Sequence, residues 1–426
     1  MPSWIRYCIA LTNVSSSMLP SAHQPALFFT HSGTSPPPDP ASVGQHIADV
    51  AEEMIRRDWE VTVFTSNRGY DNHRELYESS EILKGVHVSR LFFTSFGKSS
   101  IFTRVVGQLS LLIQTLFKCL FVKRPDAILV STQLVCIVAP FLKFLRKIPY
   151  MYWIMDLNPD QAIAAGVLRK DSLSAKLYNV LQYLVLSNAD TVVSLDRFMH
   201  KKVSKKIDKI SNHLILPPWP HEEHLNFTSG TKNSFKEENN WGNKRIFMYS
   251  GNHSLVHPLD TFLHATKEFR GESKFLMAFI GGGLGKGLIE KWIINNPDTP
   301  VTSLPYQPIS NLHRSLSAAD VHLVSMGDDM IGCIHPCKIY GAMAIGKPIL
   351  LLGNAPNHIT EILDDYDIGW SIKHGDIESM IKVLAYLRDV DRDLLLDKGK
   401  NAKKVIVGKF SQKVLLKKFC DCIDKI

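Results

Sequence analysis

The densest group of chemically capable side chains lies in one segment, Gly332 to Pro348, with the sequence GCIHPCKIYGAMAIGKP. A helix that begins near Pro336 or Cys337 would direct free backbone N–H groups and the positive end of its dipole at a ligand, and Lys338 would add a positive charge. Such a helix start stabilises a bound diphosphate. The polar residues 325–335 before it cannot pack a core by themselves, which favours a role in lining a site.

Two histidines mark a second candidate for phosphate binding. Gly251, Asn252 and His253 end a strand pattern, and His257-Pro258 opens the next helix pattern. Proline suits the first helical turn because no backbone N–H is needed there. A histidine beside a helix start can contact phosphate as a neutral donor or as a cation, or it can only cap the loop. The residues alone leave both interpretations open.

Glycines follow strand patterns at two further places. Gly44 opens the first helix pattern, and Gly281, Gly282 and Gly283 stand between a strand and a helix pattern. A missing side chain lets a nucleotide approach the backbone, but turns between strands and helices also use glycine for steric reasons, and we favour the steric interpretation for the triplet. The residues around Gly44 lack the G-x-G-x-x-G pattern, so a dinucleotide oxidoreductase loses its main support.

The composition is that of an ordinary globular protein, with 426 residues of which 45% are hydrophobic and 21% charged. This balance excludes disordered, collagenous and disulfide-stapled classes. The formal charge of +8 favours anionic partners, but the lysines lie in helix patterns without interleaved aromatic residues, which argues against nucleic acid. Seven cysteines without matching zinc ligands indicate a reducing compartment, and we expect a cytoplasmic protein without a secretory signal.

Strand patterns alternate with longer helix patterns from residue 26 onward, which is typical of βαβ units on a parallel sheet. The predicted strands include 60–66, 127–131 and 369–372, and the predicted helices include 134–145 and 260–270. We therefore predict an α/β fold of two Rossmann-like β/α/β domains that face each other across a cleft. The predicted parts are a weakly ordered extension (1–25), an N-terminal domain (26–220), a linker (221–244), a C-terminal domain (245–409) and a C-terminal helix (410–426) that packs back on the N-terminal domain.

The longest apolar stretch, residues 105–122, is interrupted by polar residues. A membrane-spanning helix needs about 20 mostly apolar residues, so we do not expect this one to cross a bilayer. Basic residues flank it, so the segment 101–124 could lie partly sunk in an anionic leaflet at the inner face of the cell membrane, or it could be a helix buried against a sheet. If it binds the membrane, replacing Leu112 and Leu116 by aspartate should release the protein from anionic liposomes.

Several short segments resemble, in the same order, the retaining glycosyltransferases of family four, which have two Rossmann-like domains in the arrangement called GT-B. The similar segments are residues 36–66, 153–168, 187–199, 214–220, 249–253, 279–283, 304–308, 317–324 and 341–350. Each motif is weak by itself, but their common order is specific. The resemblance covers roughly residues 26 to 410.

The resemblance implies that the second domain holds a nucleotide sugar and that the first holds a glycan or lipid-linked acceptor. Gly44 would lie against the donor diphosphate, Asp156 near a sugar, and His257 where many members have a phosphate-binding lysine. The implied binding residues are Gly44, Gly251, Asn252, His253, His257, Gly282, Gly283, Pro305, Tyr306, Cys337, Lys338 and Ile339. The implied catalytic residues are Asp156, His335 and Lys338.

This chain departs from the family at one important motif. Many members have two glutamates eight positions apart, the first reaching the transferred sugar and the second the ribose, but the matching positions here are Cys333 and Gly341. The segment HPCKIY (335–340) in their place indicates a subgroup variant. Asp328, Asp329 or Glu361 are candidates to replace part of their role.

The resemblance also implies a mechanism without a protein nucleophile, a cofactor or a metal, in which the leaving diphosphate takes the proton of the acceptor on the same face of the sugar. Catalysis would then consist of positioning and electrostatic stabilisation. We therefore predict a hexosyltransferase-like enzyme of cell-surface polysaccharide or glycolipid biosynthesis. The alternative, motivated by Cys333 and Gly341, is a protein of the same fold that binds nucleotide sugar without turnover. A nucleotide-sugar epimerase is disfavoured because the expected cleft is poor in glutamate.

Overall fold

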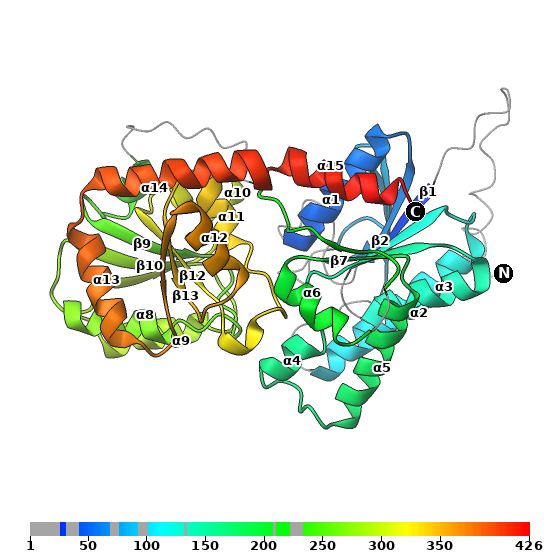
Figure 1. Ribbon diagram of the computed structural model, residues 1–426, viewed down its shortest axis with the longest axis horizontal. Coiled ribbons are helices and arrows are strands. Elements are labelled where there is room, and N and C mark those ends of the chain that lie inside the picture. Colours follow the sequence, from blue (N-terminus) through cyan, green and yellow to red (C-terminus); the bar gives the residue numbers. More distant parts are fainter. Residues whose placement is uncertain are drawn as a thin grey trace.

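The computed structural model describes residues 26–30, 42–68, 76–92, 101–131, 134–207, 210–221 and 233–426. The predicted extension 1–25 and the proline-rich loop 35–40 lie outside these residues. The described chain forms two α/β halves side by side, each with a largely parallel sheet and helices packed around it (Figure 1). This arrangement confirms the predicted fold class.

The first sheet has eight strands in the order β3-β4-β2-β1-β5-β6-β7-β8. Its strands are β1 (Ala26–Thr30), β2 (Glu60–Ser66), β3 (Ser80–Leu83), β4 (Val86–Leu91), β5 (Ala127–Ser131), β6 (Tyr150–Trp153), β7 (Thr191–Ser194) and β8 (His213–Ile215). Its helices are α1 (Ser42–Arg56), α2 (Ile101–Phe121), α3 (Val138–Arg146), α4 (Asp160–Ala164), α5 (Leu173–Asn188) and α6 (Arg197–Ser204). The central strand β5 is buried along its whole length, as expected where helices cover both faces of a parallel sheet.

The second sheet has six parallel strands in the order β11-β10-β9-β12-β13-β14. The strands are β9 (Arg245–Ser250), β10 (Phe275–Ile280), β11 (Val301–Leu304), β12 (Val321–Ser325), β13 (Ile349–Leu352) and β14 (Gly369–Ile372). The helices are α7 (Ser234–Glu238), α8 (Asp260–Ala265), α9 (Lys286–Asn295), α10 (Ile309–Ser317), α11 (Lys338–Ala344), α12 (His358–Tyr366), α13 (Ile377–Asp389) and α14 (Arg392–Val405).

The C-terminal helix α15 (Gln412–Ile423) returns to the first domain, where it lies beside α1 (Figure 1). Phe419 packs against Trp153, with ring centres 4.4 Å apart. Arg57 of the first domain donates to Asp421 and Asp424 at 2.9 and 2.6 Å. The amphipathic pattern of 410–426 therefore serves to join the end of the chain to the first core, as predicted.

Three local features differ from the expectations. The antiparallel edge strand β3 was not expected, and it joins β4 through a turn at Lys84-Gly85 with positive φ at both residues. The helices predicted at 134–145 and 260–270 are each split into an α-helix and a 3₁₀ segment. Residues 233–244, at the end of the predicted linker, include α7 and pack on the second sheet through Phe235 and Trp241.

Candidate active site

The predicted binding residues of the second domain lie in the loops that follow β9, β10 and β11 and at the start of α11, which follows β12. β9 and β12 are neighbours in the sheet, although β10 and β11 come between them in the chain. The strand order therefore changes direction between β9 and β12, and ligands of open α/β sheets bind in the crevice at such a point. The loops after β9 and β12 are the expected walls of a ligand site.

The glycines after β9 and β10 allow these two loops to pack tightly. A Cβ on Gly281 would overlap the carbonyl oxygen of Gly251. The contact is fixed by hydrogen bonds, in which His253 N donates to Gly282 O at 2.7 Å and Gly251 N donates to Ile280 O at 2.9 Å. Gly281 also has a φ of +144°, which L-residues rarely adopt. Packing of the chain on itself therefore accounts for glycine at this position.

His253 lies buried between these loops with 1% of its surface exposed. Its ring stacks on Tyr249, with centres 5.2 Å apart, and neither ring nitrogen has a hydrogen-bond partner in the part of the chain that the structure describes. Burial, and next the charge of Lys338, lowers the pKa of His253 to about 4. A neutral imidazole with two unsatisfied nitrogens offers one donor and one acceptor to a ligand.

Lys338 is the positive group of this site. Its ammonium lies 5.0 Å from the centre of the Tyr249 ring, and its Cε would be 2.7 Å from a Cβ placed on Gly251. Burial lowers the pKa of Lys338 to about 8. No carboxylate within the described ranges forms an ion pair with it, and no side chain caps the start of α11. A buried cation without a counter-charge is costly, so an anionic ligand would stabilise this arrangement.

His257 does not offer phosphate the donor group that a lysine at this position would offer. Its Nδ1 donates to the carbonyl oxygen of Ser325 at 2.7 Å. Burial, with a contribution from Lys338, holds the pKa of His257 well below its usual value. The neutral ring then has its only N–H engaged, and Nε2 is an acceptor. In this state His257 ties the loop after β9 to β12 and cannot itself donate to a phosphate.

Three residues of the HPCKIY segment point into the protein. Both ring nitrogens of His335 are engaged, Nδ1 with Asp196 and Nε2 with Tyr340, each at 2.8 Å. Ile339 is fully buried in the core of the second domain. The Cys337 thiol donates to the carbonyl oxygen of His335 at 3.3 Å. The structure thus brings Lys338 to the site, whereas both ring nitrogens of His335 are hydrogen-bonded to Asp196 and Tyr340.

Pro305, Tyr306 and Asn252 lie at the exposed rim of the same sheet edge. A Cβ on Gly282 would come within 2.8 Å of the Tyr306 ring, so the tyrosine covers this glycine. The carbonyl oxygen of Pro305 accepts a hydrogen bond from Gln307 Nε2 at 3.0 Å. An exposed aromatic ring at this place is suited to stack on a nucleobase, because every base has a π-face.

Asp156 and Gly44 belong to the first domain. Gly44 is buried in the first turn of α1. Asp156 follows β6, and burial raises its pKa to about 6. The next residue, Leu157, donates its backbone N–H to Cys333 O at 2.8 Å. Asp156 therefore stands beside the segment of the second domain that leads to α11.

We expect Asp156→Asn to raise the melting temperature near neutral pH and to have no effect in acid. The folded protein holds the Asp156 proton up to about pH 6, whereas the ordinary value is 3.8. The folded state therefore binds more protons between these values, and the wild type loses stability as the pH rises through this window. Asparagine has no proton to lose. Melting curves of both proteins from about pH 4 to about pH 8 measure the difference. An equal shift at every pH would contradict the assignment, and exposed Asp365→Asn serves as the control.

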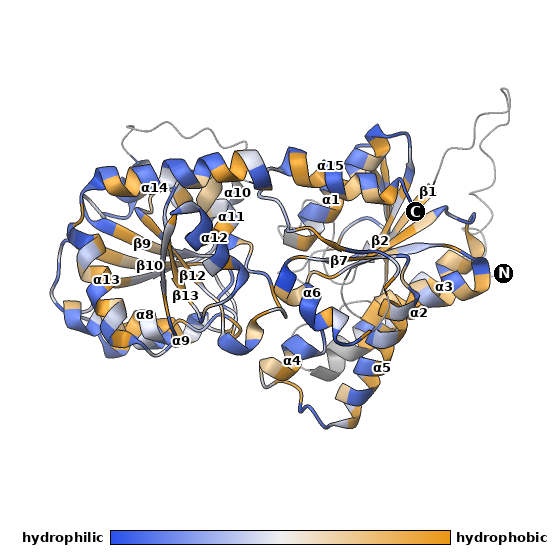
Figure 2. Ribbon diagram, in the orientation of Figure 1, coloured by the Kyte–Doolittle hydropathy of each residue, from blue (hydrophilic) through white to orange (hydrophobic). Residues whose placement is uncertain are grey.

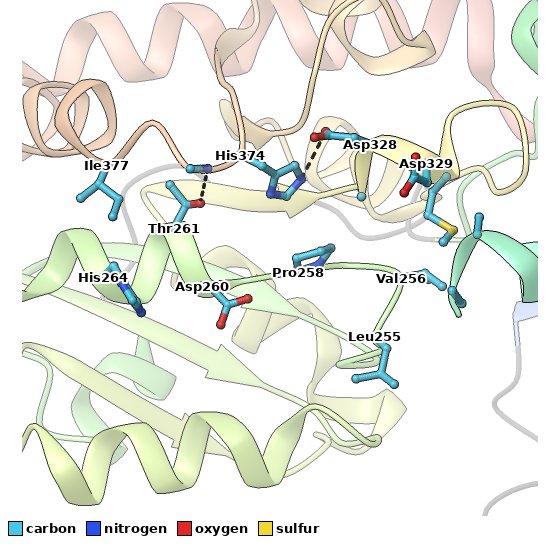
Figure 3. Close-up of a pocket in the computed structure, with 15 residues that line it drawn as sticks. Leu255, Val256, Pro258, Asp260, Thr261, His264, Asp328, Asp329, His374 and Ile377 are labelled. Carbon is cyan, nitrogen blue, oxygen red and sulfur yellow. Dashed lines mark hydrogen bonds and ion pairs between the residues drawn. The ribbon is translucent and has the colours of Figure 1, made fainter. Parts of the chain in front are cut away.

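A pocket of about 510 Å³ is lined by the end of the loop after β9 and by the start of α8 (Figure 3). Carboxylates and histidines of the second domain line it together with apolar residues, and Ala164 and Ala165 of the first domain complete its wall. The lining includes Pro258, Asp260, Asp328, Asp329, Met330 and His374. His374 donates to Met326 O at 2.9 Å and lies 4.0 Å from Asp328. Carboxylates beside apolar surfaces can accept hydrogen bonds from hydroxyls while the apolar surface packs on a ring face.

Sequence reasoning did not identify two residues that organise this region. Tyr249 lies under both His253 and Lys338, and a tyrosine inside a strand pattern is more often core. Asp196 caps α6 by accepting from Phe198 N and Met199 N, and an aspartate before a helix pattern signals only that capping role. Its contact with His335 joins residues 139 positions apart, which no local pattern reveals.

Comparisons with known proteins agree with this fold. Residues 42–217 match the model of the Glycosyl transferase 4-like domain. The chain is 26% identical over 303 residues to "Probable glycosyltransferase WbjE" of Pseudomonas aeruginosa, which covers 71% of this chain and 75% of that protein. The fold is similar to that of WaaG, a glycosyltransferase involved in lipopolysaccharide biosynthesis, with a TM-score of 0.68, 12% identity and coverage of 93% and 99%. It is also similar to HepE of Anabaena in complex with UDP-glucose, with a TM-score of 0.68, 13% identity and coverage of 94% and 100%.

Proposed function

We propose that this chain, a glycosyltransferase with two Rossmann-like domains of the GT-B type, moves a sugar from a nucleotide-sugar donor to a glycan or lipid-linked acceptor in cell-surface polysaccharide or glycolipid biosynthesis. The observation that carries the proposal is the buried ammonium of Lys338, which lacks a carboxylate partner among the described residues, beside neutral His253 at the strand ends of β9 and β12. The similarity to WaaG and to HepE with UDP-glucose supports it.

In this proposal the diphosphate of the donor lies at Lys338, the first residue of α11. Positive charge there stabilises the diphosphate as the bond to the sugar breaks, which is electrostatic catalysis by preorganised groups. The acceptor oxygen bonds to the anomeric carbon on the face from which the diphosphate departs, and the departing diphosphate takes the proton of that hydroxyl. Because attack and departure occur on the same face, the configuration at the sugar is retained. Lys338 supplies the charge that a metal would otherwise supply, and we expect turnover to persist in the presence of a chelator. The anomer of the product, determined by NMR, tests retention.

We assign the pocket of about 510 Å³ to a sugar unit of the acceptor. Its volume lies within the range of small-molecule sites, about 300 to 1,000 Å³. Asp260, Asp328 and Asp329 would accept hydrogen bonds from hydroxyls, while Pro258 and Met330 offer an apolar surface (Figure 3). Both domains contribute to the lining, as an acceptor site at a domain junction requires.

A thermal-shift screen with UDP, GDP, ADP, dTDP and their common sugar conjugates tests donor binding. A ligand that binds only the folded state stabilises it by RT ln(1 + [L]/Kd). A selective shift with one base would support the proposal and name the donor class. The absence of a shift with every nucleotide would count against it, because a donor site open at Lys338 and His253 does not need the acceptor to form.

We further propose that the first domain binds an anionic membrane surface. Among the described residues, no helix combines the length and the apolar character needed to cross a bilayer. Large apolar side chains are nevertheless exposed on α2, α3 and α5, which contact one another in that order. Hydrophobic residues occur along all three helices (Figure 2). The exposed side chains are Leu109, Ile113, Phe117, Phe121, Phe141, Phe144, Leu145, Leu173, Leu177, Val180 and Leu184. Exposed basic residues, Lys123, Arg124 and Lys147, border this apolar face, which suits a surface that inserts among anionic headgroups.

The structure also corrects the choice of substitutions for testing this surface. Leu112 and Leu116 pack against the core of the first domain, so aspartate there would disturb the fold. The exposed stripe of α2 runs through Leu109, Ile113, Phe117 and Phe121 instead.

Phe117→Asp combined with Phe121→Asp is expected to weaken binding to vesicles that contain phosphatidylglycerol by about 100-fold or more, because burying each phenylalanine contributes roughly 1.5–3 kcal/mol. Co-sedimentation of the protein with these vesicles measures the change in binding. The matched control is Leu288→Asp with Ile294→Asp, two equally exposed apolar residues on α9 of the second domain. Equal binding of the Phe117/Phe121 variant and wild type, or failure of wild type to bind, would reject the surface.

A further inference from the structure

Contacts from the first domain converge on a short segment of the second domain, residues 333–335. Leu157 N donates to Cys333 O, and Lys202 Nζ donates to Cys333 Sγ, both at 2.8 Å. Asp196 accepts from His335 Nδ1 at 2.8 Å. These partners come from three separate parts of the first domain, namely the loops after β6 and β7 and helix α6. The segment that precedes α11 is therefore held from the opposite domain.

Asp196 is itself fixed in place. Its Oδ1 accepts from Phe198 N at 2.9 Å and from Met199 N at 2.8 Å, which caps α6, and Oδ2 faces His335. Burial alone would raise the pKa of Asp196, but the hydrogen bond from His335 and the nearby charges lower it to about 2. The carboxylate is thus ionised at every ordinary pH, and it orients the imidazole with Nδ1 as the donor.

His335 is in turn hydrogen-bonded to α11. With the proton on Nδ1, Nε2 accepts from the hydroxyl of Tyr340 at 2.8 Å. Tyr340 is 1% exposed and lies in the first turn of α11, two residues after Lys338. The His335 ring is also stacked on His358 at 3.8 Å with an angle of 17° between planes. A continuous chain of hydrogen bonds therefore runs from the first domain to the helix that carries Lys338.

A metal site is the other arrangement that these residues suggest, since Asp196, His335 and His358 offer ligand atoms within 4.8 Å of one another. The ring planes of the two histidines are almost parallel and 3.8 Å apart. Nitrogen lone pairs lie in the ring planes, so two stacked rings cannot both direct one at the same ion. Asp196 Oδ1 is also occupied by the helix cap. The geometry fits hydrogen bonding rather than coordination.

We propose that Asp196, His335 and Tyr340 are positioning residues, through which the contact between the two domains sets the place of Lys338 in the donor site. The inference rests on the proposed function, because it assumes that Lys338 binds the donor diphosphate. None of the three side chains lies at the donor position, so they act through Lys338 and α11. Donor affinity of the second domain then depends on Asp196 of the first domain.

The test is a titration of purified full-length variants with the nucleoside diphosphate, chosen from UDP, GDP, ADP and dTDP, that stabilises the wild type most. Tyr340→Phe removes only the hydroxyl, and Asp196→Asn keeps the capping oxygen. We expect each to raise the Kd by about three- to tenfold, and we expect the double variant to be no weaker than the worse single one, since both break the same chain. In turnover, KM for the donor should rise more than KM for the acceptor.

Two further variants separate positioning from a general loss of domain contact. Arg197→Gln removes an exposed ion pair between the domains, to Glu361, without touching residues 333–340, and we expect an unchanged Kd. His335→Gln, whose amide can donate to Asp196 and accept from Tyr340, should retain part of the affinity that His335→Ala loses. Unchanged Kd in Tyr340→Phe and Asp196→Asn, or an equal loss in Arg197→Gln, would overturn the proposal. A wild type that binds none of the four diphosphates would instead reject the proposed function itself.

Discussion

Replacement of Lys338 by methionine is expected to weaken donor binding by roughly 10- to 100-fold, because a charge-assisted hydrogen bond to phosphate contributes about 1.5–3 kcal/mol. The ammonium lies at the start of α11 over Tyr249, and no carboxylate in the described chain pairs with it. Methionine has a similar length and no charge, so the packing against Gly251 is largely kept. Isothermal titration with the nucleoside diphosphate measures the loss.

The same substitution should make the protein more stable near neutral pH. Burial lowers the pKa of Lys338 from 10.5 to about 8. Between these values the unfolded chain holds a proton that the folded chain lacks, so wild-type stability rises with pH through this window and is lowest below it. The gain of Lys338→Met over wild type should therefore be largest below about pH 8 and shrink toward about pH 10.5. Lower affinity combined with unchanged or reduced stability would contradict the account of Lys338 as a buried cation without a partner.

Gly281→Ala is expected to destabilise the protein by roughly 2 to 5 kcal/mol without any ligand present, because overpacking and a positive φ each cost about 1–3 kcal/mol. The new Cβ would overlap the carbonyl oxygen of Gly251, which is backbone and cannot move aside like a side-chain end. The loops after β9 and β10 would separate, and the donor site between them would be lost. Denaturant unfolding of the protein without ligand measures the effect.

Gly287→Ala is the matched control for this prediction. Gly287 lies in α9, and a Cβ there would meet no atom within 4 Å. Alanine should stabilise this helix by about 0.5–1 kcal/mol. A Gly281→Ala protein with wild-type stability and weakened nucleotide binding would show that the glycine admits the ligand, and it would reject the packing explanation.

The two-domain fold could be predicted because strand and helix periods are local signals. The strand ranges 60–66, 127–131 and 369–372 agree with the structure residue by residue. The return of α15 to the first domain was also predictable, since its amphipathic pattern required a partner after the second sheet was complete. Its contacts with Arg57 and Trp153 join residues far apart in the chain and could not be named from the sequence.

The sequence alone did not predict which side of a helix faces solvent. The apolar residues of α2 nearly encircle the helix, so hydropathy does not distinguish buried Leu111 from exposed Phe117. Only the position of the sheet and of α3 decides which side is covered. Tertiary packing therefore determines which stripe of α2 is exposed. The exposed stripe in turn determines which substitutions test membrane binding.

The candidate site was predictable in its location but not in the roles of its histidines. The patterns placed His253 and His257 in the loop after a strand and Lys338 at the start of a helix, and the structure has them after β9 and at the start of α11. Hydrogen-bond partners then separate the histidines. His253 keeps both ring nitrogens unpaired within the described chain, whereas His257 is bonded to Ser325 and His335 to Asp196. These partners come from other strands or from the other domain, so spacing along the chain carries no information about them.

The proposed reaction is the transfer of a sugar from a nucleotide donor bound at Lys338. The most direct measurement is the release of nucleoside diphosphate from the sugar nucleotide selected by the binding screen, with a lipid extract as the acceptor pool, for wild type and Lys338→Met. We expect release that depends on the extract and falls at least about tenfold in the variant. A wild type that binds the nucleotide sugar but never releases nucleoside diphosphate would contradict this proposal, and would identify a binding protein that retains the fold without turnover.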